Sequence, residues 1–427
     1  MFNVLFDPWL SVISTKGVSK RICLMDALTG AGTIQIAYPN PMDKLAAFRF
    51  ILALLYWCKE HTHDDLSEDI PPSWITFLSK NKDLFNLFGT GARFYQEANL
   101  NRTRPITELF HEVPTGNNAW HFHHVRDYGT GVCCSCCVTG MLRLPLFSVS
   151  GLPDLKSGIN GSPPTYVLYW GTNLFSAVKY NWHPQENMGD PIWVAPYGYT
   201  QDDEVPLLPG LTVPARKLYL EYPHDSEEPC IVCGEKPGRL VTFCQFESAG
   251  SLENSTWHDP HTIFSGERLV RPENIMLTGK LVKDMKYREL LPQFLKNHQS
   301  TSPRQILIIG FSTKEAKYVD IWERTMVIDH LQLNSEKLEV ISKWNDFVYN
   351  TPIHPKGKNE RQESLRKSLF NDLLPNVENK LLPKLTQLMN SDNPDWNKAG
   401  DLYRPSLKIS ASALYPNPLD VDRKSVV

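Results

Sequence analysis

Six of the nine cysteines fall in two short segments, and their spacing constrains the fold more than any other feature of the sequence. GVCCSCC, residues 131–137, holds four of them, and CIVC, residues 230–233, holds two. A chain of 427 residues needs no disulfide framework, and its start, MFNVLFDPWLSV, lacks the basic region and cleavage site of a secretory leader. We therefore expect a reducing, cytoplasmic compartment, where paired CxxC motifs usually bind metal.

The two segments together can supply four thiolates to one ion. CIVC gives one CxxC pair, whereas GVCCSCC contains two overlapping pairs, Cys133 with Cys136 and Cys134 with Cys137. Four thiolates complete a tetrahedral Zn²⁺ shell and leave no position for water, which is typical of a structural site. The long separation of the segments predicts a clamp between distant parts of one domain. Buried free thiols or a redox pair are the alternative.

Composition favours two domains and gives no sign of an enzyme. The net charge is −3, from 44 basic and 47 acidic residues, which does not indicate a free-standing nucleic-acid binder. The longest apolar run, residues 50–57, is too short to span a bilayer, so no membrane partner is expected. Neither a GxxxxGK[ST] phosphate loop nor a GxSxG elbow is present.

Hydrophobic periodicity predicts an α+β fold with a large mixed N-terminal domain at residues 1–327. The opening FNVLFDPWLSVIS predicts a short strand pair around Pro8. Two helices are expected, Asp43–Lys59 and Pro72–Lys80. The expected strands are Tyr166–Trp170, Ala215–Glu221, Leu240–Phe246 and Gln305–Gly310.

After Val327 the pattern becomes helical and predicts a small C-terminal helical bundle at residues 328–427. Proline residues separate the apolar stretches. The expected helices are Glu336–Val348, Glu360–Leu373, Val377–Met389 and a fourth near Pro405–Leu414.

Three histidine-rich segments offer a different function, a zinc-containing metal-dependent hydrolase or nuclease. They are HTHDD (residues 61–65), HFHH (121–124) and HDPH (258–261). The first is more typical of the solvated end of a helix, because no matching downstream His-Asp pair follows it. The other two lie in aromatic, proline-rich loops, where histidines commonly serve packing.

Taken in order, several segments resemble the CasA-type large subunit of the type I-E CRISPR surveillance complex, Cascade. They are FNVLFDPWLSV at the start, RFYQ (93–96), KSGINGSPP (156–164), DPH (259–261), GFSTKEAKYVDIWER (310–324) and the two CxxC motifs. They span about residues 1–330. The resemblance implies that the structural Zn²⁺ is held by Cys134, Cys137, Cys230 and Cys233.

The resemblance also implies a non-catalytic subunit that recognises the protospacer-adjacent motif of double-stranded target DNA and begins strand separation for R-loop formation. A glycine-containing loop is expected to approach the minor groove, and a hairpin is expected to wedge between the strands. The motif contacts implied are Ser150, Gly151, Leu152 and Lys156, with Glu247 and Ser248 where the family has a lysine. The wedge residues implied are Lys314, Glu315, Ala316 and Lys317.

The partners implied are the CRISPR RNA, the other Cascade subunits, the target duplex and a helicase–nuclease or other effector nuclease. Trp120, Phe122 and His123 match the segment that docks the subunit onto the complex. The C-terminal region resembles a shortened form of the family's four-helix bundle, which predicts altered contacts with the small subunits and the nuclease.

Overall fold

The computed structural model describes ten stretches of the chain: residues 2–113, 131–149, 156–195, 204–250, 252–254, 256–262, 264–265, 268–269, 305–314 and 317–327. The chain divides into two units. The first comprises Met1–Thr262 and Gln305–Met326, and the second comprises Ile263–Arg304 and Val327–Val427. Of the second unit, the described residues are Val327 and a short antiparallel pair, β10 (Phe264–Ser265) with β11 (Arg268–Leu269).

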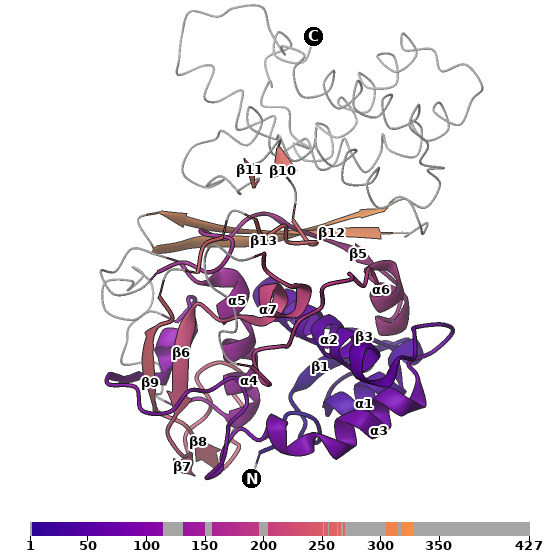
Figure 1. The fold of residues 1–427 in the computed structure, drawn as a ribbon. Helices are drawn as coiled ribbons and strands as arrows, with labels where there is room; N and C mark the ends of the chain where they lie inside the picture. The colour runs from indigo at the N-terminus through magenta and orange to yellow at the C-terminus, as the bar shows by residue number, and fades with distance from the viewer. Residues whose placement is uncertain are drawn as a thin grey trace, which may run out of the picture. The chain divides into compact units, whose positions relative to one another are not determined.

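The first unit mixes helices with short antiparallel sheets (Figure 1). Its helices are α1 (Leu24–Thr29), α2 (Pro41–Thr62), α3 (Pro72–Lys80), α4 (Cys134–Leu142), α5 (Leu144–Phe147), α6 (Leu174–Tyr180) and α7 (Leu207–Thr212), with 3₁₀ turns η1 (Ala31–Thr33), η2 (Lys82–Phe85) and η3 (Ile106–Leu109). Its strands are β1 (Leu10–Ser14), β2 (Ser19–Ile22), β3 (Ile34–Ile36), β4 (Thr103–Pro105), β5 (Tyr166–Trp170), β6 (Arg216–Leu220), β7 (His224–Asp225), β8 (Arg239–Leu240), β9 (Phe243–Ser248), β12 (Gln305–Lys314) and β13 (Lys317–Val327).

Helix α2 is the centre of this unit, and α3, α4, α7, β3 and β12 pack against it (Figure 1). It begins where the Asn40 side chain accepts a hydrogen bond from the Met42 amide, with Pro41 in the first turn. It ends at His63, whose left-handed backbone lets its amide bond back to Lys59. From Leu45 to Cys58 every residue is buried, as expected of a helix that is covered on all sides.

Three three-stranded sheets complete the unit, in the orders β2-β1-β3, β4-β9-β6 and β13-β12-β5. The last joins distant parts of the sequence, since β5 pairs antiparallel with β12 from Trp170 opposite Gln305 to Tyr166 opposite Ile309. Strand β5 is buried along its whole length, and it also bonds to the 261–262 segment. The sheet therefore binds the end of the first unit's sequence to its middle.

Arg143 fixes the C-terminal end of α4 to the start of α2. Its guanidinium donates to both carboxylate oxygens of Asp43, at 2.7 and 2.8 Å, and to Glu112 at 2.8 Å. Burial disfavours its charge, but these two carboxylates outweigh burial and raise the pKa of Arg143 above its ordinary value. Helix α4 is thus held at both ends, because its N-terminal end carries the cysteine cluster described below.

Most predicted elements of the N-terminal part are present, with two errors. Helix Pro72–Lys80 and strand Tyr166–Trp170 have the predicted bounds. The strand pair around Pro8 is wrong: residues before it form turns, and β1 pairs with β2 instead. The strand predicted at 240–246 is interrupted, because Val241 leaves the strand to bridge Val132. The predicted bundle at 328–427 lies outside the described residues.

Candidate functional site

The four cysteines that meet are Cys133, Cys136, Cys230 and Cys233. Their sulfur atoms all lie within 4.8 Å of one another, and those of Cys133 and Cys233 are 3.8 Å apart. The Cys133 amide donates to the sulfur of Cys230 at 3.3 Å. Three of the four residues are buried, and Cys233 is half-buried. Elsewhere in the described part of the chain, no second group of three or more ligand-type side chains comes together.

The pair chosen from the family resemblance, Cys134 with Cys137, is wrong by one residue. The segment is the start of a helix: Cys133 is the N-cap of α4, and its sulfur accepts from the Cys136 amide at 3.4 Å. This first turn places Cys133 and Cys136 side by side. Cys137 lies on another face, fully buried in the core, and Cys134 lines an open pocket with Phe88 and Tyr222.

Hydrogen bonds within the cluster shift the pKa values of its thiols in opposite directions. Hydrogen bonds from Cys133 and Cys136 hold the pKa of Cys230 well below its ordinary value and bring the pKa of Cys233 to about 6. The pKa of Cys136 is raised in turn, since it is the protonated partner of Cys133, Cys230 and Cys233. Outside the cluster, burial raises the pKa of Cys134 to about 11. Negative charge is therefore favoured on Cys230 and Cys233 and disfavoured on Cys136 and on Cys134 beside the cluster.

This donor set fits a tetrahedral metal ion. Zinc–thiolate bonds of about 2.3 Å require sulfur–sulfur edges of about 3.8 Å, the separation observed between Cys133 and Cys233. A disulfide would require about 2 Å. Four thiolates leave no open coordination position, so a metal held here would join α4 to the 230–233 turn and would not activate water.

A second cluster lies at the end of the β6–β9 ladder, where Arg216 and Ser248 are opposite each other. The hydroxyl of Ser248 accepts from the amide of Lys156 at 3.3 Å. The guanidinium of Arg216 donates to the carbonyl groups of Lys156, Ala215 (2.9 Å) and Val149 (2.7 Å). Two residues that the resemblance linked to DNA, Lys156 and Ser248, are thus brought together across 92 positions of sequence.

The remaining polar groups at this edge are already paired. The carboxylate of Glu247 accepts from the Asn101 amide at 2.5 Å, and Lys217 pairs with Glu97 at 2.7 Å. Lys156 is exposed. The sequence patterns did not indicate a role for Arg216. Strand β6 contains both polar and apolar residues, so its sequence gave no sign that this arginine is only 4% exposed.

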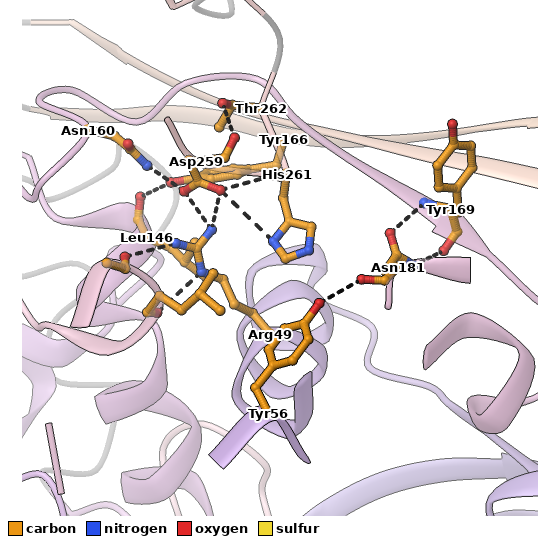
Figure 2. A network of polar contacts seen from close by, with 12 residues as sticks. Arg49, Tyr56, Leu146, Asn160, Tyr166, Tyr169, Asn181, Asp259, His261 and Thr262 are labelled. Carbon is orange, nitrogen blue, oxygen red and sulfur yellow. Dashed lines mark hydrogen bonds and ion pairs between the residues drawn. The ribbon is translucent and has the colours of Figure 1, made fainter. Parts of the chain in front are cut away.

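A buried polar network connects two of the sequence landmarks to helix α2 (Figure 2). Asp259 of the DPH segment accepts from Arg49 of α2 at 2.6 and 2.8 Å. It also accepts from the side chain of Asn160, within KSGINGSPP, at 2.8 Å, and from the His261 amide at 3.0 Å. The turn that follows Lys156 is therefore anchored to the central helix.

The segment predicted to act as a wedge lies where β12 is followed by β13, two neighbours in one sheet that are separated by two residues of sequence. Lys314 ends the first strand and Lys317 begins the second, whereas Glu315 and Ala316 lie outside the described residues. Glu323 of β13 pairs with Lys44 of α2 through both oxygens at 2.7 Å. The hairpin is therefore tied to the core through β13.

Other predicted sites are used differently or are not described. The ring of His61 packs on Phe77 and bonds the Trp57 carbonyl at 3.0 Å, which confirms that HTHDD ends a helix. His258 is exposed and His261 is buried in the network above. The docking residues Trp120, Phe122 and His123 lie outside the described residues, as do Ser150, Gly151 and Leu152.

A comparison with known protein families identifies the family of this chain. The model of the CRISPR-associated protein Cse1 family matches residues 3–338. The chain belongs to the Cse1 family. A search of curated protein sequences found no match.

Solved Cse1 structures have the same fold. CasA of Thermus thermophilus shares 18% identity with a TM-score of 0.65, covering 97% of this chain and 93% of that one. Cse1 of Acidimicrobium ferrooxidans shares 16% identity with a TM-score of 0.65, covering 97% and 92%. A chain of a CRISPR RNA-guided surveillance complex shares 13% identity with a TM-score of 0.61, covering 99% and 97%. The predicted resemblance to a CasA-type large subunit is confirmed.

Membership of the Cse1 family accounts for the order of the sequence landmarks, and three of these landmarks make contacts in the fold. Asn160 of KSGINGSPP donates to Asp259 of DPH. Arg93 of RFYQ donates to the Leu220 carbonyl at 2.9 Å and lies beside the rings of Tyr219 and Tyr222. In the described ranges, no helix has the length and apolar character needed to cross a bilayer.

Proposed function

We propose that this Cse1-family chain is the non-catalytic large subunit of an RNA-guided surveillance complex and recognises the motif that flanks the target in double-stranded DNA. Family membership supports the place in a complex. The observation that carries DNA recognition is the meeting of Lys156 and Ser248, joined at 3.3 Å on an exposed edge. The guide RNA then recognises the target sequence by base pairing.

The proposed motif-contacting surface consists of Lys156, Ser248 and residues 150–152, which precede Lys156 in sequence. An exposed ammonium can bind a phosphate, and a hydroxyl can donate to or accept from a base edge. Ser248 stands where the family has a lysine, so a weaker dependence on one base is expected. Glu247, held by Asn101, disfavours phosphate beside it.

Strand separation is assigned to the hairpin of β12 and β13. Lys314 and Lys317 flank its tip and are placed in sequence to hold the phosphates on either side of an opened step. The Lys44–Glu323 pair resists displacement of the hairpin when it meets DNA.

A structural Zn²⁺ is proposed at Cys133, Cys136, Cys230 and Cys233. The sulfur–sulfur spacing and the four-thiolate donor set support zinc. Its role would be to hold the 230–233 turn against α4, two elements that lie far apart in the sequence.

The proposed partners are the CRISPR RNA, the other subunits, the target duplex and a helicase–nuclease or other effector nuclease, in the cytoplasm. Trp120, Phe122 and His123 remain the proposed docking residues, and residues 328–427 the proposed shortened bundle.

The decisive test is a duplex-binding titration of the guide-loaded complex, with and without this chain. The duplexes differ only in the bases that flank the target. A dependence on those bases that requires this chain supports the proposal. Equal affinities with and without the chain would contradict it.

A further inference from the structure

An open pocket of about 480 Å³ lies next to the cysteine cluster, and Cys134 forms part of its wall. Segments that are far apart in the sequence meet around it, and most of the side chains they contribute are aromatic or apolar. The lining residues that matter here are Phe2, Phe88, Cys134, Tyr222, Pro223 and Arg239. Pockets of about 300–1,000 Å³ with mostly apolar walls and a few polar groups are typical binding sites.

Tyr222 is exposed but held in place. Its side chain is 58% exposed, yet its hydroxyl donates to the Gly89 carbonyl at 3.2 Å. The guanidinium of Arg93 lies 4.7 Å from the centre of its ring, and the ring of Phe88 lies 5.7 Å away. Because the ring is already ordered, a partner that packs on it does not have to immobilise it first.

The arginine behind Tyr222 indicates what the pocket accepts. Arg93 is 7% exposed and donates to the carbonyl groups of Gly89 at 3.0 Å and Leu220 at 2.9 Å. A fixed cation therefore already packs against the ring of Tyr222 from the protein side. A second cation on the same ring would be less favoured than another aromatic ring, which packs by its edge or in an offset stack.

Charges beside the pocket disfavour a nucleotide as its occupant. Among the lining residues the basic one is Arg239, which pairs with Asp225 at 3.3 Å and donates to the Pro223 carbonyl at 2.8 Å. Asp225 is followed closely by Glu227 and Glu228, and both are exposed. Carboxylates in this position repel phosphate and attract basic side chains, so a protein segment fits better than RNA or DNA.

We propose that this pocket docks an aromatic side chain, flanked by basic residues, of another protein subunit of the surveillance complex. This inference rests on the proposed function, which places the chain in such a complex. The docked ring packs on Tyr222, and the flanking basic residues pair with Glu227 and Glu228. An aromatic anchor in a preformed pocket commonly carries a large share of the binding energy of an interface.

The test measures the affinity of this chain for the guide-loaded complex that lacks it. Tyr222→Ser removes the ring and should raise the Kd about tenfold or more. Tyr222→Phe keeps the ring and should stay within about threefold of the wild type. Phe243→Ser is the matched control, because Phe243 is 46% exposed but does not line the pocket, and its Kd should change less than about twofold.

Two further measurements test the pocket without removing Tyr222. Thr90→Trp fills it from an exposed lining position and should also raise the Kd about tenfold, which decides the matter if Tyr222→Ser does not fold. Glu227→Lys with Glu228→Lys should slow association about tenfold at low salt. Alkylation of Cys134 by iodoacetamide, followed by mass spectrometry, should be slower in the assembled complex than in the free chain, because the docked side chain covers the pocket.

Wild-type affinity in both Tyr222→Ser and Thr90→Trp overturns the inference, as does an equal loss in Phe243→Ser. If Tyr222→Ser instead weakens binding of the free chain to guide RNA alone, the occupant is a nucleic acid and the inference is wrong. If the wild-type chain does not join the complex at all, the proposed function fails as well. If it joins and the pocket variants bind equally well, only the docking pocket is refuted.

Discussion

Arg49 and Asp259 lie 210 positions apart in sequence and form a buried ion pair, with one guanidinium nitrogen 2.6 and 2.8 Å from the two carboxylate oxygens. Their side chains are 2% and 0% exposed (Figure 2). The same carboxylate holds Asn160 and the His261 amide. Removing either charge would leave the other buried and unpaired, which is more costly than removing both.

We therefore expect Asp259→Ala to lower the free energy of unfolding by about 3–5 kcal/mol. Asp225→Ala is the matched control, because its pair with Arg239 is at the surface, with side chains 93% and 63% exposed. Asp225→Ala should lower the free energy of unfolding by less than about 1 kcal/mol. Urea denaturation followed by tryptophan fluorescence measures both. Similar losses in the two variants would refute a special role for the buried pair.

The neutral state of His111 should make stability depend on pH. Burial, assisted by the charge of Arg143, lowers its pKa to about 4 from the usual 6.5. In the unfolded chain the ring takes up a proton near pH 6.5, so its contribution to stability is complete above that pH and is lost progressively down to about pH 4. The loss should be about 1–3 kcal/mol.

His111→Gln removes the titrating ring and keeps a polar side chain. Melting temperatures from about pH 7 to about pH 4.5 should fall less steeply for this variant than for the wild type. If the melting temperature of His111→Gln falls with pH as steeply as that of the wild type, groups other than His111 cause the pH dependence.

Adjacent cysteines provide a sharp test of the proposed metal site. If the cluster binds a metal, Cys133→Ser should lose it and lower the melting temperature, because only three thiolates remain. Cys134→Ser, one residue away and outside the cluster, should retain the metal. Metal content by mass spectrometry of the purified variants, with and without a chelator, decides between them. Metal loss from Cys134→Ser with retention in Cys133→Ser would reinstate the pair chosen from the family resemblance.

The hairpin test concerns strand separation. Lys314→Ala with Lys317→Ala should slow opening of the target duplex about tenfold while preserving the dependence on flanking bases. Lys16→Ala with Lys20→Ala removes the same charge from exposed positions near the β1–β2 turn and serves as the control. Fluorescence of a base analogue at the first target position reports opening. Equal opening rates in the two double variants would contradict a role for the hairpin in strand separation.

A side chain at Gly310 should require a shift of its neighbours. A Cβ there would lie 2.3 Å from the indole of Trp322 on the adjacent strand. Gly310→Ala must displace that ring, and we expect a loss of about 1–3 kcal/mol together with an altered tryptophan spectrum. Gly32→Ala is the control, since no atom lies within 4 Å of the added carbon.

Local patterns predicted the elements well where one periodicity dominated. Helix α2 has apolar residues at helical spacing after Asn40 and Pro41, and strand β5 is a continuous apolar run that ends before Gly171, so each pattern indicated the type and place of its element. The start of strand β9 was predicted less well, because the bridge between Val241 and Val132 is set by a partner far away in the sequence. Pairing between distant elements is not encoded locally.

The candidate site was predicted in outline only. CxxC spacing identified the type of cluster, but the choice between Cys133 and Cys134 depended on which residue caps α4, a single turn of backbone. Arg49 could have been suspected, since an arginine inside an otherwise apolar helix requires a buried partner. Arg216 could not, because its partners are carbonyl groups, which every residue has.

The pairing of β5 with β12 has a consequence for synthesis. Residues 166–170 leave the ribosome long before residues 305–309, and residues 263–304 must be made in between. Until then the buried strand β5 has an unpaired edge that any exposed strand could occupy. Translation speed across residues 263–304 thus sets how long the nascent first unit stays incomplete, and truncation before residue 305 should yield an aggregating chain.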